Sequence, residues 1–427
     1  MEFNKYYETS GICIDTRKIE KNCLFVCLKG ENFNGNDFAE QALISGAKYV
    51  ISDDKKYINY NNIFVVDNSL KYLQELANFH RKQFEIPIIG ITGTNGKTTS
   101  KELISSVLSE KYNTLYTLGN LNNHIGVPLT LLKLNKEHEI AVIEMGANKP
   151  GDIKELVEIA EPTHGIITNM GKAHLEGFGS FEGVQKTKSE MYDFLSKNDA
   201  TVFYNYDDEI LKSNLQNQKL NLIPFSSEHN SYIKGELISM SPFINMKWST
   251  SEYESPLLET KMIGSYNYYN FLAAICIGKY FGVENDKINH ALINYQPSNN
   301  RSQIEKTANN LLILDAYNAN PTSMKNAIES FNSMVSEHKL LILGDMFELG
   351  NDSKEEHKRV VQHTKELKLN TLFVGEHFYK FKNESDTNFF KNKEEIRLYL
   401  ENNTIKNKLI LLKASRGIGL ETLKDVL

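Results

Sequence analysis

Short runs of consecutive apolar residues recur along the chain, and segments with a helical spacing of apolar positions follow them. One such run is the segment 86–92, IPIIGIT. In the segment after it, Leu103, Ile104 and Val107 fall on one face of a helix. Continuous apolar strands separated by amphipathic helices are typical of parallel sheets that helices cover on both faces. The pattern therefore predicts an α/β protein built on parallel sheets.

This alternation divides the chain into three blocks, 1–82, 83–298 and 299–427, and predicts one domain for each. The first block mixes short strand patterns with helical stretches, and the other two each repeat the strand–helix alternation. The strand patterns lie at 22–30, 47–53 and 62–67, then at 86–92, 139–146, 164–171 and 200–208, and finally at 310–321, 339–350, 370–376 and 408–417.

Polar and glycine-bearing residues follow most of these apolar runs at their carboxyl ends. They are Thr92-Gly93, Glu144 to Gly146, Asn169 to Gly171, Asp315 to Asn318, and Gly344-Asp345. Open parallel sheets bind ligands beyond the carboxyl ends of their strands. Two successive sheets with such ends predict chemistry in a cleft between them.

Composition places few other constraints on function. The 427 residues are 41% hydrophobic and 24% charged, as in soluble globular proteins, and the net charge of −6 gives no broad electrostatic reason to bind nucleic acid. No apolar run approaches the roughly 20 residues needed to span a membrane, and the first residues lack a signal-peptide pattern. The four cysteines include no CxxC pair, which favours reduced, buried thiols. We expect a cytoplasmic protein without membrane insertion.

The segment Gly93 to Thr98 has the residues of a phosphate-binding loop, in the short form G-x-x-G-K-T. Glycines let the backbone approach phosphate oxygens, Lys97 supplies a positive charge, and a hydroxyl after the lysine can ligate Mg²⁺. The usual longer motif has a glycine where this chain has Ile91, so a plain strand-to-helix turn is the alternative. The strand before the loop and the helix after it favour nucleotide phosphate binding.

Three further residues are candidates for a metal site. Glu144 follows an apolar strand, where nucleotide-binding sheets often present an acid to Mg²⁺, although a surface glutamate is the alternative. His174 follows another strand, where a packed or solvated histidine is equally consistent with the residues. Lys188 lies near a helix start and on local evidence is a surface lysine. An unprotonated lysine can add carbon dioxide and form a carbamate, which is a carboxylate-like metal ligand.

Several longer segments carry a family resemblance. They are 15–38, 90–102, 119–132, 144–153, 169–180, 315–324 and 343–350. With them the chain resembles the Mur ligases of bacterial cell-wall synthesis over essentially its full length, and Ile91 is normal in that family's short loop. The segments after residue 102 are similar to signatures of the member that joins D-alanyl-D-alanine to UDP-N-acetylmuramoyl-tripeptide, the last cytoplasmic step of peptidoglycan precursor synthesis.

The resemblance implies a fold of three domains and an ATP-dependent reaction. The domains are a small α/β N-terminal domain that binds the UDP-sugar, a central P-loop-type parallel-sheet ATPase domain, and a C-terminal Rossmann-like domain that binds the incoming dipeptide. The peptide carboxylate is expected to become an acyl phosphate, which the amine of D-alanyl-D-alanine attacks. A monomer is expected.

The resemblance also assigns roles to individual residues. The expected ATP-binding residues are Gly93, Thr94, Asn95, Gly96, Lys97, Thr98, Thr99, Asn267, Asn270, Arg301 and Asp315. Two Mg²⁺ ions are expected on Thr98, Glu144, His174 and carbamylated Lys188, with Lys186 as the nearby competitor. Lys97, Glu144, His174 and Lys188 form the expected catalytic set.

Substrate-binding roles are implied in the same way. Thr16, Arg17, Lys29 and Gly30 match the UDP side, Asn122 and Asn123 the growing peptide, and Asn318, Asn320 and Arg416 the D-alanyl-D-alanine side. Ordinary turn chemistry is the alternative for each group. The chain departs from the family pattern at Leu314, where an acid is common, and at Ala414, where glycine is common. Both departures affect the expected acceptor pocket.

Two other functions remain open on the sequence. A related ligase, such as folylpolyglutamate synthetase, would share the loop and the metal ligands. A nucleotide-dependent switch would hydrolyse ATP slowly without an acceptor.

Overall fold

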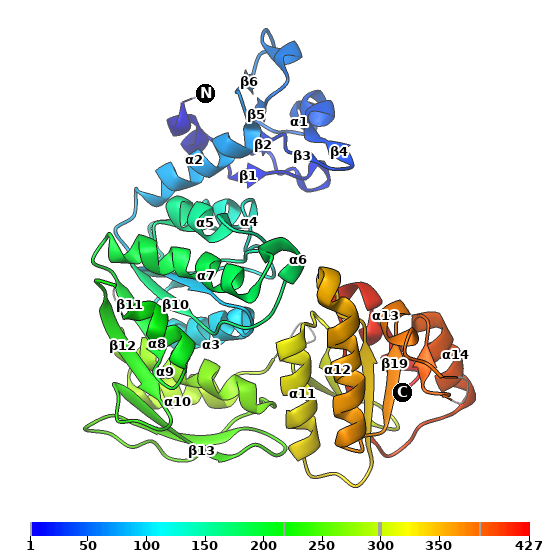
Figure 1. Ribbon diagram of the computed structural model, residues 1–427. Coiled ribbons are helices and arrows are strands. Elements are labelled where there is room, and N and C mark those ends of the chain that lie inside the picture. Colours follow the sequence, from blue (N-terminus) through cyan, green and yellow to red (C-terminus); the bar gives the residue numbers. More distant parts are fainter. Residues whose placement is uncertain (1, 217, 298–300, 384–385) are drawn as a thin grey trace.

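The computed structural model describes residues 2–216, 218–297, 301–383 and 386–427, and its three α/β units follow one another along the chain (Figure 1). Each unit is built on a largely parallel sheet, as the apolar pattern predicts. The predicted boundary at residues 298 and 299 lies outside the described residues. No helix in the described ranges combines the length and the apolar character needed to cross a membrane.

The N-terminal unit has a four-stranded parallel sheet in the order β1-β2-β5-β6. Its strands are β1 (Ile12–Cys13), β2 (Leu24–Val26), β5 (Tyr49–Ser52) and β6 (Ile63–Val65), with helix α1 (Ala39–Ile44). The small hairpin of β3 (Lys29–Gly30) and β4 (Phe33–Asn34) extends from it. The buried thiols of Cys13, Cys23 and Cys27 pack in this unit, as the cysteine pattern predicts.

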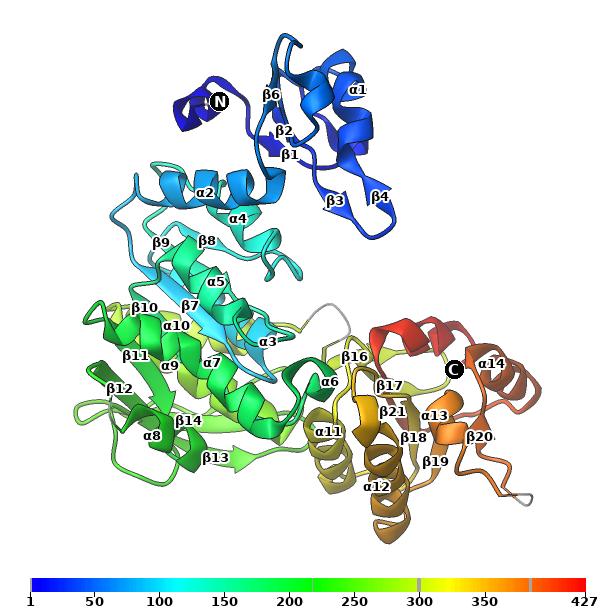
Figure 2. The ribbon, with the colours of Figure 1, turned by 45° about the horizontal axis from the view of Figure 1, so that its top comes forward.

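Helix α2 (Ser69–Arg81) belongs by sequence to the first block, and it packs against both the first and the second units. Its Leu73 and Leu76 join one hydrophobic cluster with helices α4 (Gly126–Leu131) and α5 (Asp152–Ala160), and Figure 2 shows α2 lying over these helices. The domain boundary at residue 82 stays a prediction.

The central unit has a nine-stranded sheet in the order β15-β14-β13-β12-β11-β10-β7-β9-β8. The strands from β8 to β13 in this order are parallel, and β14 and β15 add an antiparallel edge. The strands are β7 (Ile88–Thr92), β8 (Thr114–Tyr116), β9 (Ile140–Glu144), β10 (His164–Ile167), β11 (Thr201–Asn205), β12 (Asn221–Ser226), β13 (Ile233–Ser239), β14 (Asn245–Ser249) and β15 (Leu258–Glu259).

Helices cover both faces of the central sheet because successive strand residues point to opposite sides. Ile88 packs with α2, α4, α5 and α7 (Phe181–Ser196), whereas Ile89 packs with α3 (Lys97–Ser109), α9 (Tyr268–Tyr280) and α10 (Asn285–Asn294). The short helices α6 (Leu175–Phe178) and α8 (Glu209–Leu215) complete the unit.

The C-terminal unit has a six-stranded sheet in the order β16-β17-β21-β18-β19-β20, in which only β16 pairs antiparallel. Its strands are β16 (Gln303–Lys306), β17 (Leu311–Asp315), β18 (Lys339–Gly344), β19 (Thr371–Val374), β20 (Phe389–Phe390) and β21 (Leu409–Lys413). Helices α11 (Pro321–Ser333) and α12 (Ser353–Glu366) cover one face, and α14 (Lys393–Asn402) packs on the other. The short α13 (Glu376–Tyr379) follows β19.

Candidate active site

A cleft of about 1570 Å³ lies between the central and C-terminal sheets, at the carboxyl ends of their strands. The sequence predicted chemistry at this place, and the structure brings most of the predicted residues together there. The predicted residues that line the cleft are Thr94, Asn95, Gly96, Lys97, Thr98, Thr99, Asn122, Asn123, Glu144, His174, Asn267, Asn270, Arg301, Asp315, Asn318 and Asn320.

The candidate phosphate loop connects β7 to α3, and its two glycines allow a backbone that other residues rarely adopt. Gly93 has φ +143° and Gly96 has φ +79°. A Cβ on Gly93 would lie 2.0 Å from the Thr168 hydroxyl, and one on Gly96 would lie 2.8 Å from Asn270 Oδ1. The loop therefore requires glycine at both positions.

Residues after β10 hold the loop in place. The Asn95 amide donates to Asn169 Oδ1 across 3.1 Å, and the Thr168 hydroxyl donates to the Asn95 carbonyl across 2.6 Å. These bonds tie the loop to the neighbouring strand end, so its geometry is fixed before any ligand binds.

Lys97 begins α3 and folds back over the loop. Its ammonium donates to the Gly93 and Thr94 carbonyls at 2.8 and 3.0 Å. Burial lowers the pKa of Lys97 to about 8, while the negative charge of Glu144 opposes that shift. An anion in the cleft would favour the charged lysine and compete for its hydrogen bonds.

Glu144 ends β9 and is 1% exposed, so the surface-glutamate alternative is wrong. Its Oε1 accepts hydrogen bonds from the Thr98 hydroxyl at 3.1 Å and from the Asn122 amide at 2.8 Å. Its Oε2 is buried and has no hydrogen-bond partner among the residues that the structure describes, and the buried Lys101 ammonium lies 3.9 Å from it. A buried carboxylate oxygen lacking a partner, beside a hydroxyl, fits the oxygen ligands that Mg²⁺ prefers.

His174 and Lys188 each lie near the Phe178 ring, and neither forms a hydrogen bond or ion pair with Glu144. The His174 ring meets the Phe178 ring edge-on at 6.3 Å, and the Lys188 ammonium lies 5.7 Å from the same ring. His174 Nδ1 is paired with Glu348 of the C-terminal unit. His174 therefore contacts both units, and its role as a metal ligand stays a prediction.

Lys188 is 2% exposed, whereas the competitor Lys186 is exposed. The surface-lysine alternative for Lys188 is therefore wrong. Burial, followed by repulsion from Lys97, holds the pKa of Lys188 well below its usual value. Lys188 does not line the cleft directly, because it lies on α7 behind Phe178.

The two asparagines expected at the adenine form a connected pair, as their spacing of three residues predicts. Asn270 donates to Asn267 Oδ1 across 2.9 Å and accepts from the Ser100 hydroxyl at 3.0 Å. Asn267 donates to the Ile263 carbonyl across 2.9 Å. The chain of bonds joins α3 to α9 beside the loop.

On the C-terminal side, the guanidinium groups of two arginines lie near the Tyr317 ring. The Arg301 guanidinium lies 3.8 Å from the Tyr317 ring centre and that of Arg416 lies 5.4 Å from it. Arg301 Nε is buried without a hydrogen-bond partner among the described residues. Asp315 accepts from the Lys413 ammonium at 2.6 Å. Sequence reasoning missed Tyr317 and Lys413, although both lie within or beside quoted motifs.

The remaining asparagines show local turn chemistry as well as a place in the cleft. Asn123 Oδ1 accepts from the Gly126 amide at 2.8 Å, and Asn318 Oδ1 accepts from the Ala319 amide at 2.9 Å. Asn320 caps α11 and also donates to Asn95 Oδ1 across 2.8 Å. This last bond connects the phosphate loop directly to the C-terminal unit.

The residues expected to bind the UDP part lie outside the cleft, in the N-terminal unit. Arg17 forms a bidentate pair with Asp15, at 2.9 and 2.8 Å, and Lys29 pairs with Asp53 at 2.9 Å. Thr16 and Gly30 adjoin these pairs, and Arg416 also does not line the cleft. Their substrate roles stay predictions.

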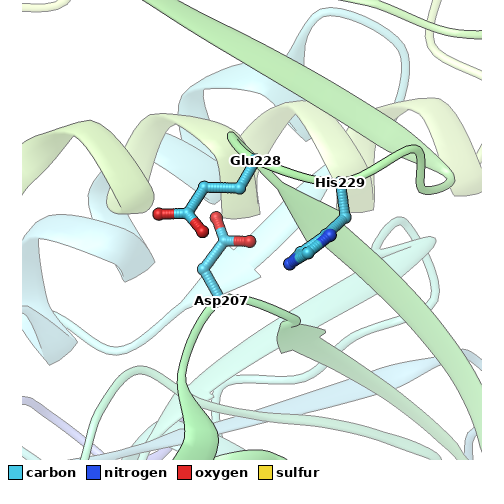
Figure 3. A group of neighbouring side chains, drawn as sticks. All are labelled: Asp207, Glu228 and His229. Carbon is cyan, nitrogen blue, oxygen red and sulfur yellow. The ribbon is translucent and has the colours of Figure 1, made fainter.

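A different cluster, Asp207, Glu228 and His229, brings three possible metal-ligand atoms within 4.8 Å of one another (Figure 3). The Asp207 carboxylate already accepts hydrogen bonds from Ser226, Ser227 and Tyr269. Glu228 and His229 are exposed. Glu144 and Thr98 therefore remain the better candidate cation site.

Comparisons with known proteins agree with this geometry. Three family models match the chain: "Mur ligase family, catalytic domain" at 8–88, "Mur ligase middle domain" at 91–278, and "Mur ligase, glutamate ligase domain" at 300–416. The UDP-N-acetylmuramoyl-tripeptide–D-alanyl-D-alanine ligase of Bacillus subtilis (strain 168) is 35% identical, over 99% of this chain and 95% of its own.

Solved structures of Mur ligases are also similar to this chain. The crystal structure of MurF from Acinetobacter baumannii has a TM-score of 0.87 at 31% identity, covering 97% of this chain and 92% of that one. The structure of MurF ligase from Thermotoga maritima in complex with ADP has a TM-score of 0.86 at 27% identity, covering 98% and 97%.

Proposed function

The chain belongs to the Mur ligase family, and we propose that it joins D-alanyl-D-alanine to UDP-N-acetylmuramoyl-tripeptide at the expense of ATP. The observation that carries this function is the cleft in which the phosphate loop meets the C-terminal unit, through the bond between Asn95 and Asn320. The full-length similarity to ligases of that name supports the substrates. The product is the precursor pentapeptide of peptidoglycan, and we expect the enzyme to act as a cytoplasmic monomer.

The chemical difficulty is that a carboxylate is resonance-stabilised and a poor acceptor for an amine. In the proposed reaction, the terminal carboxylate of the tripeptide attacks the γ-phosphorus of ATP and releases ADP. The acyl phosphate that forms has a good leaving group. The amine of D-alanyl-D-alanine then attacks the acyl carbon, loses a proton and expels phosphate, which leaves an amide.

Two anions must meet in the first step, so positive charge in the cleft carries it. Lys97 would leave the loop carbonyls and bind the β- and γ-phosphates. Asn267 and Asn270 would contact the adenine, and Arg301 and Asp315, which line the same cleft, would contact the nucleotide from the C-terminal side. These groups come from two units, so ligand binding should draw the units together and exclude water from the acyl phosphate.

Two Mg²⁺ ions complete the proposal. Thr98 and Glu144 would hold the first, and Glu144, His174 and a carbamate on Lys188 would hold the second. When bound, these ions neutralise charge on the transferred phosphoryl group. The burial of Lys188 favours the unprotonated amine that adds carbon dioxide, which supports the carbamate.

The proposed test is direct. The purified chain is incubated with ATP, D-alanyl-D-alanine and UDP-N-acetylmuramoyl-tripeptide carrying either lysine or diaminopimelate in third position, and the products are weighed by mass spectrometry. We expect one amide product and phosphate release that depends on D-alanyl-D-alanine. Phosphate release without an acceptor would favour a nucleotide-dependent switch. An amide product in a parallel incubation with folate in place of the tripeptide and glutamate in place of D-alanyl-D-alanine would favour the folylpolyglutamate reaction.

A further inference from the structure

His174 and Glu348 come from different units and meet at the edge of the cleft. His174 directly precedes α6 in the central unit, and Glu348 lies in the loop after β18 in the C-terminal unit. His174 Nδ1 lies within hydrogen-bonding distance of Glu348 Oε2, and the histidine side chain is 25% exposed and the glutamate 57%. Both side chains of the pair are thus partly exposed to solvent.

Both residues are held in a backbone conformation that residues with a Cβ adopt rarely. His174 has φ 49° and Glu348 has φ 62°, in the left-handed region. Residues in this region are strained, and they concentrate at functional sites. Here the two strained residues belong to opposite units and contact each other.

The surrounding loops support this contact. A Cβ on Gly350 would lie 3.4 Å from Glu176 Cβ, so the loop after Glu348 already touches α6. An ion pair, between Lys172 and Glu356 at 3.7 Å, crosses the same interface. The loop that carries His174 and the loop that carries Glu348 therefore contact each other through more residues than this one pair.

The geometry assigns the two imidazole nitrogens different tasks. A carboxylate at Nδ1 favours the tautomer with its proton there, which leaves the Nε2 lone pair free to bind a cation. Among the described residues Nε2 has no hydrogen-bond partner, and His174 lines the cleft. Carboxylates in this outer position commonly orient metal-binding histidines.

We propose that Glu348 is a positioning residue that orients His174 as a cation ligand, so that docking of the C-terminal unit completes the second cation site. This inference rests on the proposed role of His174 in the ligase. It explains why a cation ligand of the central unit is paired with a residue of the unit expected to bring the acceptor. Cation binding and domain docking then favour each other.

The test measures cation binding by the full-length protein rather than turnover. Mn²⁺ bound in the presence of a non-hydrolysable ATP analogue is counted by electron paramagnetic resonance for the wild type, Glu348→Ala, Glu348→Gln, His174→Ala and Glu355→Gln. We expect two ions in the wild type and weakening of the second by about 10–100-fold in Glu348→Ala. Glu348→Gln should fall between, because its amide oxygen still accepts from Nδ1–H.

The matched control is Glu355→Gln, which removes charge from an exposed position of α12 whose ion pair, with Arg359, stays within that helix, and it should leave both affinities unchanged. Thermal melting of each variant shows that it is folded. Wild-type Mn²⁺ binding by Glu348→Ala, alongside loss of the second ion in His174→Ala, would overturn the positioning role alone. Two ions bound normally by His174→Ala would overturn it together with the cation assignment of His174, while the product assay above decides the ligase reaction separately.

Discussion

The Thr98 hydroxyl donates a hydrogen bond to Glu144 Oε1 across 3.1 Å and so joins the start of α3 to the end of β9. The other carboxylate oxygen of Glu144 is buried and has no hydrogen-bond partner within the described part of the chain. A hydrogen-bonded hydroxyl beside a free anionic oxygen gives a cation two oxygen ligands that are already in place. This relationship, more than the loop alone, distinguishes the site from a plain strand-to-helix turn.

Glu144→Gln should abolish most of the activity. The amide keeps the size of the side chain and can still accept from Thr98, but the negative charge is lost. We expect the rate of ADP formation to fall roughly 10²-fold or more, and the Mg²⁺ concentration for half-maximal rate to rise. A Mg²⁺ titration measures both. The exposed Glu137→Gln is the control, and wild-type kinetics in Glu144→Gln would contradict the cation site.

Lys97→Met should separate catalysis from stability. The substitution removes the cation proposed to bind the phosphates, so we expect kcat to fall by roughly 10²-fold or more. Because burial already lowers the pKa of Lys97 to about 8, an apolar side chain of similar length should not lower the melting temperature. Steady-state rates and thermal unfolding of Lys97→Met and the exposed control Lys133→Met test this. A large loss of stability with unchanged kcat would show a structural role.

Lys188→Ala tests the carbamate. Loss of the side chain removes one proposed ligand of the second Mg²⁺ ion, so activity should fall roughly 10²-fold. Bicarbonate or short carboxylic acids should partly restore it, since they can occupy the vacated space as carboxylates. The exposed neighbour supplies the control, because Lys186→Ala should behave as wild type. Full activity of untreated Lys188→Ala would remove the carbamate from the mechanism.

The strands of the fold could be predicted because most of them are buried on both faces. The segment 139–146 contains β9 (Ile140–Glu144), and the segment 408–417 contains β21 (Leu409–Lys413). Strands β13 and β14 were not predicted, because they lie at a sheet edge where buried and more exposed positions alternate. An alternating pattern is weaker than a continuous apolar run and resembles a polar loop.

Some residues of the candidate site could likewise be predicted from the sequence, and others could not. The phosphate loop is a local motif, so its residues could be predicted from their spacing. Glu348 and Tyr317 could not, because their contacts with His174 and Arg301 arise only when separate segments of the chain meet. The family resemblance supplied Lys188, but only the fold shows that its ammonium is buried beside Phe178.

His164 should make the protein less stable as the pH falls. It begins β10, and the rings of Phe203, Tyr280 and Phe281 surround it. Burial lowers the pKa of His164 from 6.5 to about 4. Between these values the unfolded chain binds a proton that the folded chain excludes, so stability is complete above pH 6.5 and declines toward pH 4.

At pH 5 this loss amounts to about 2 kcal/mol of unfolding free energy, as an order of magnitude. His164→Gln removes the titration and should unfold with a smaller difference between pH 7.5 and pH 5 than the wild type. Urea unfolding at both pH values measures that difference, and the exposed His338→Gln should retain the wild-type dependence. An equal pH dependence in His164→Gln and the wild type would contradict this prediction. It would mean that the aromatic environment of His164 tolerates the protonated imidazole and that other groups cause the loss of stability at low pH.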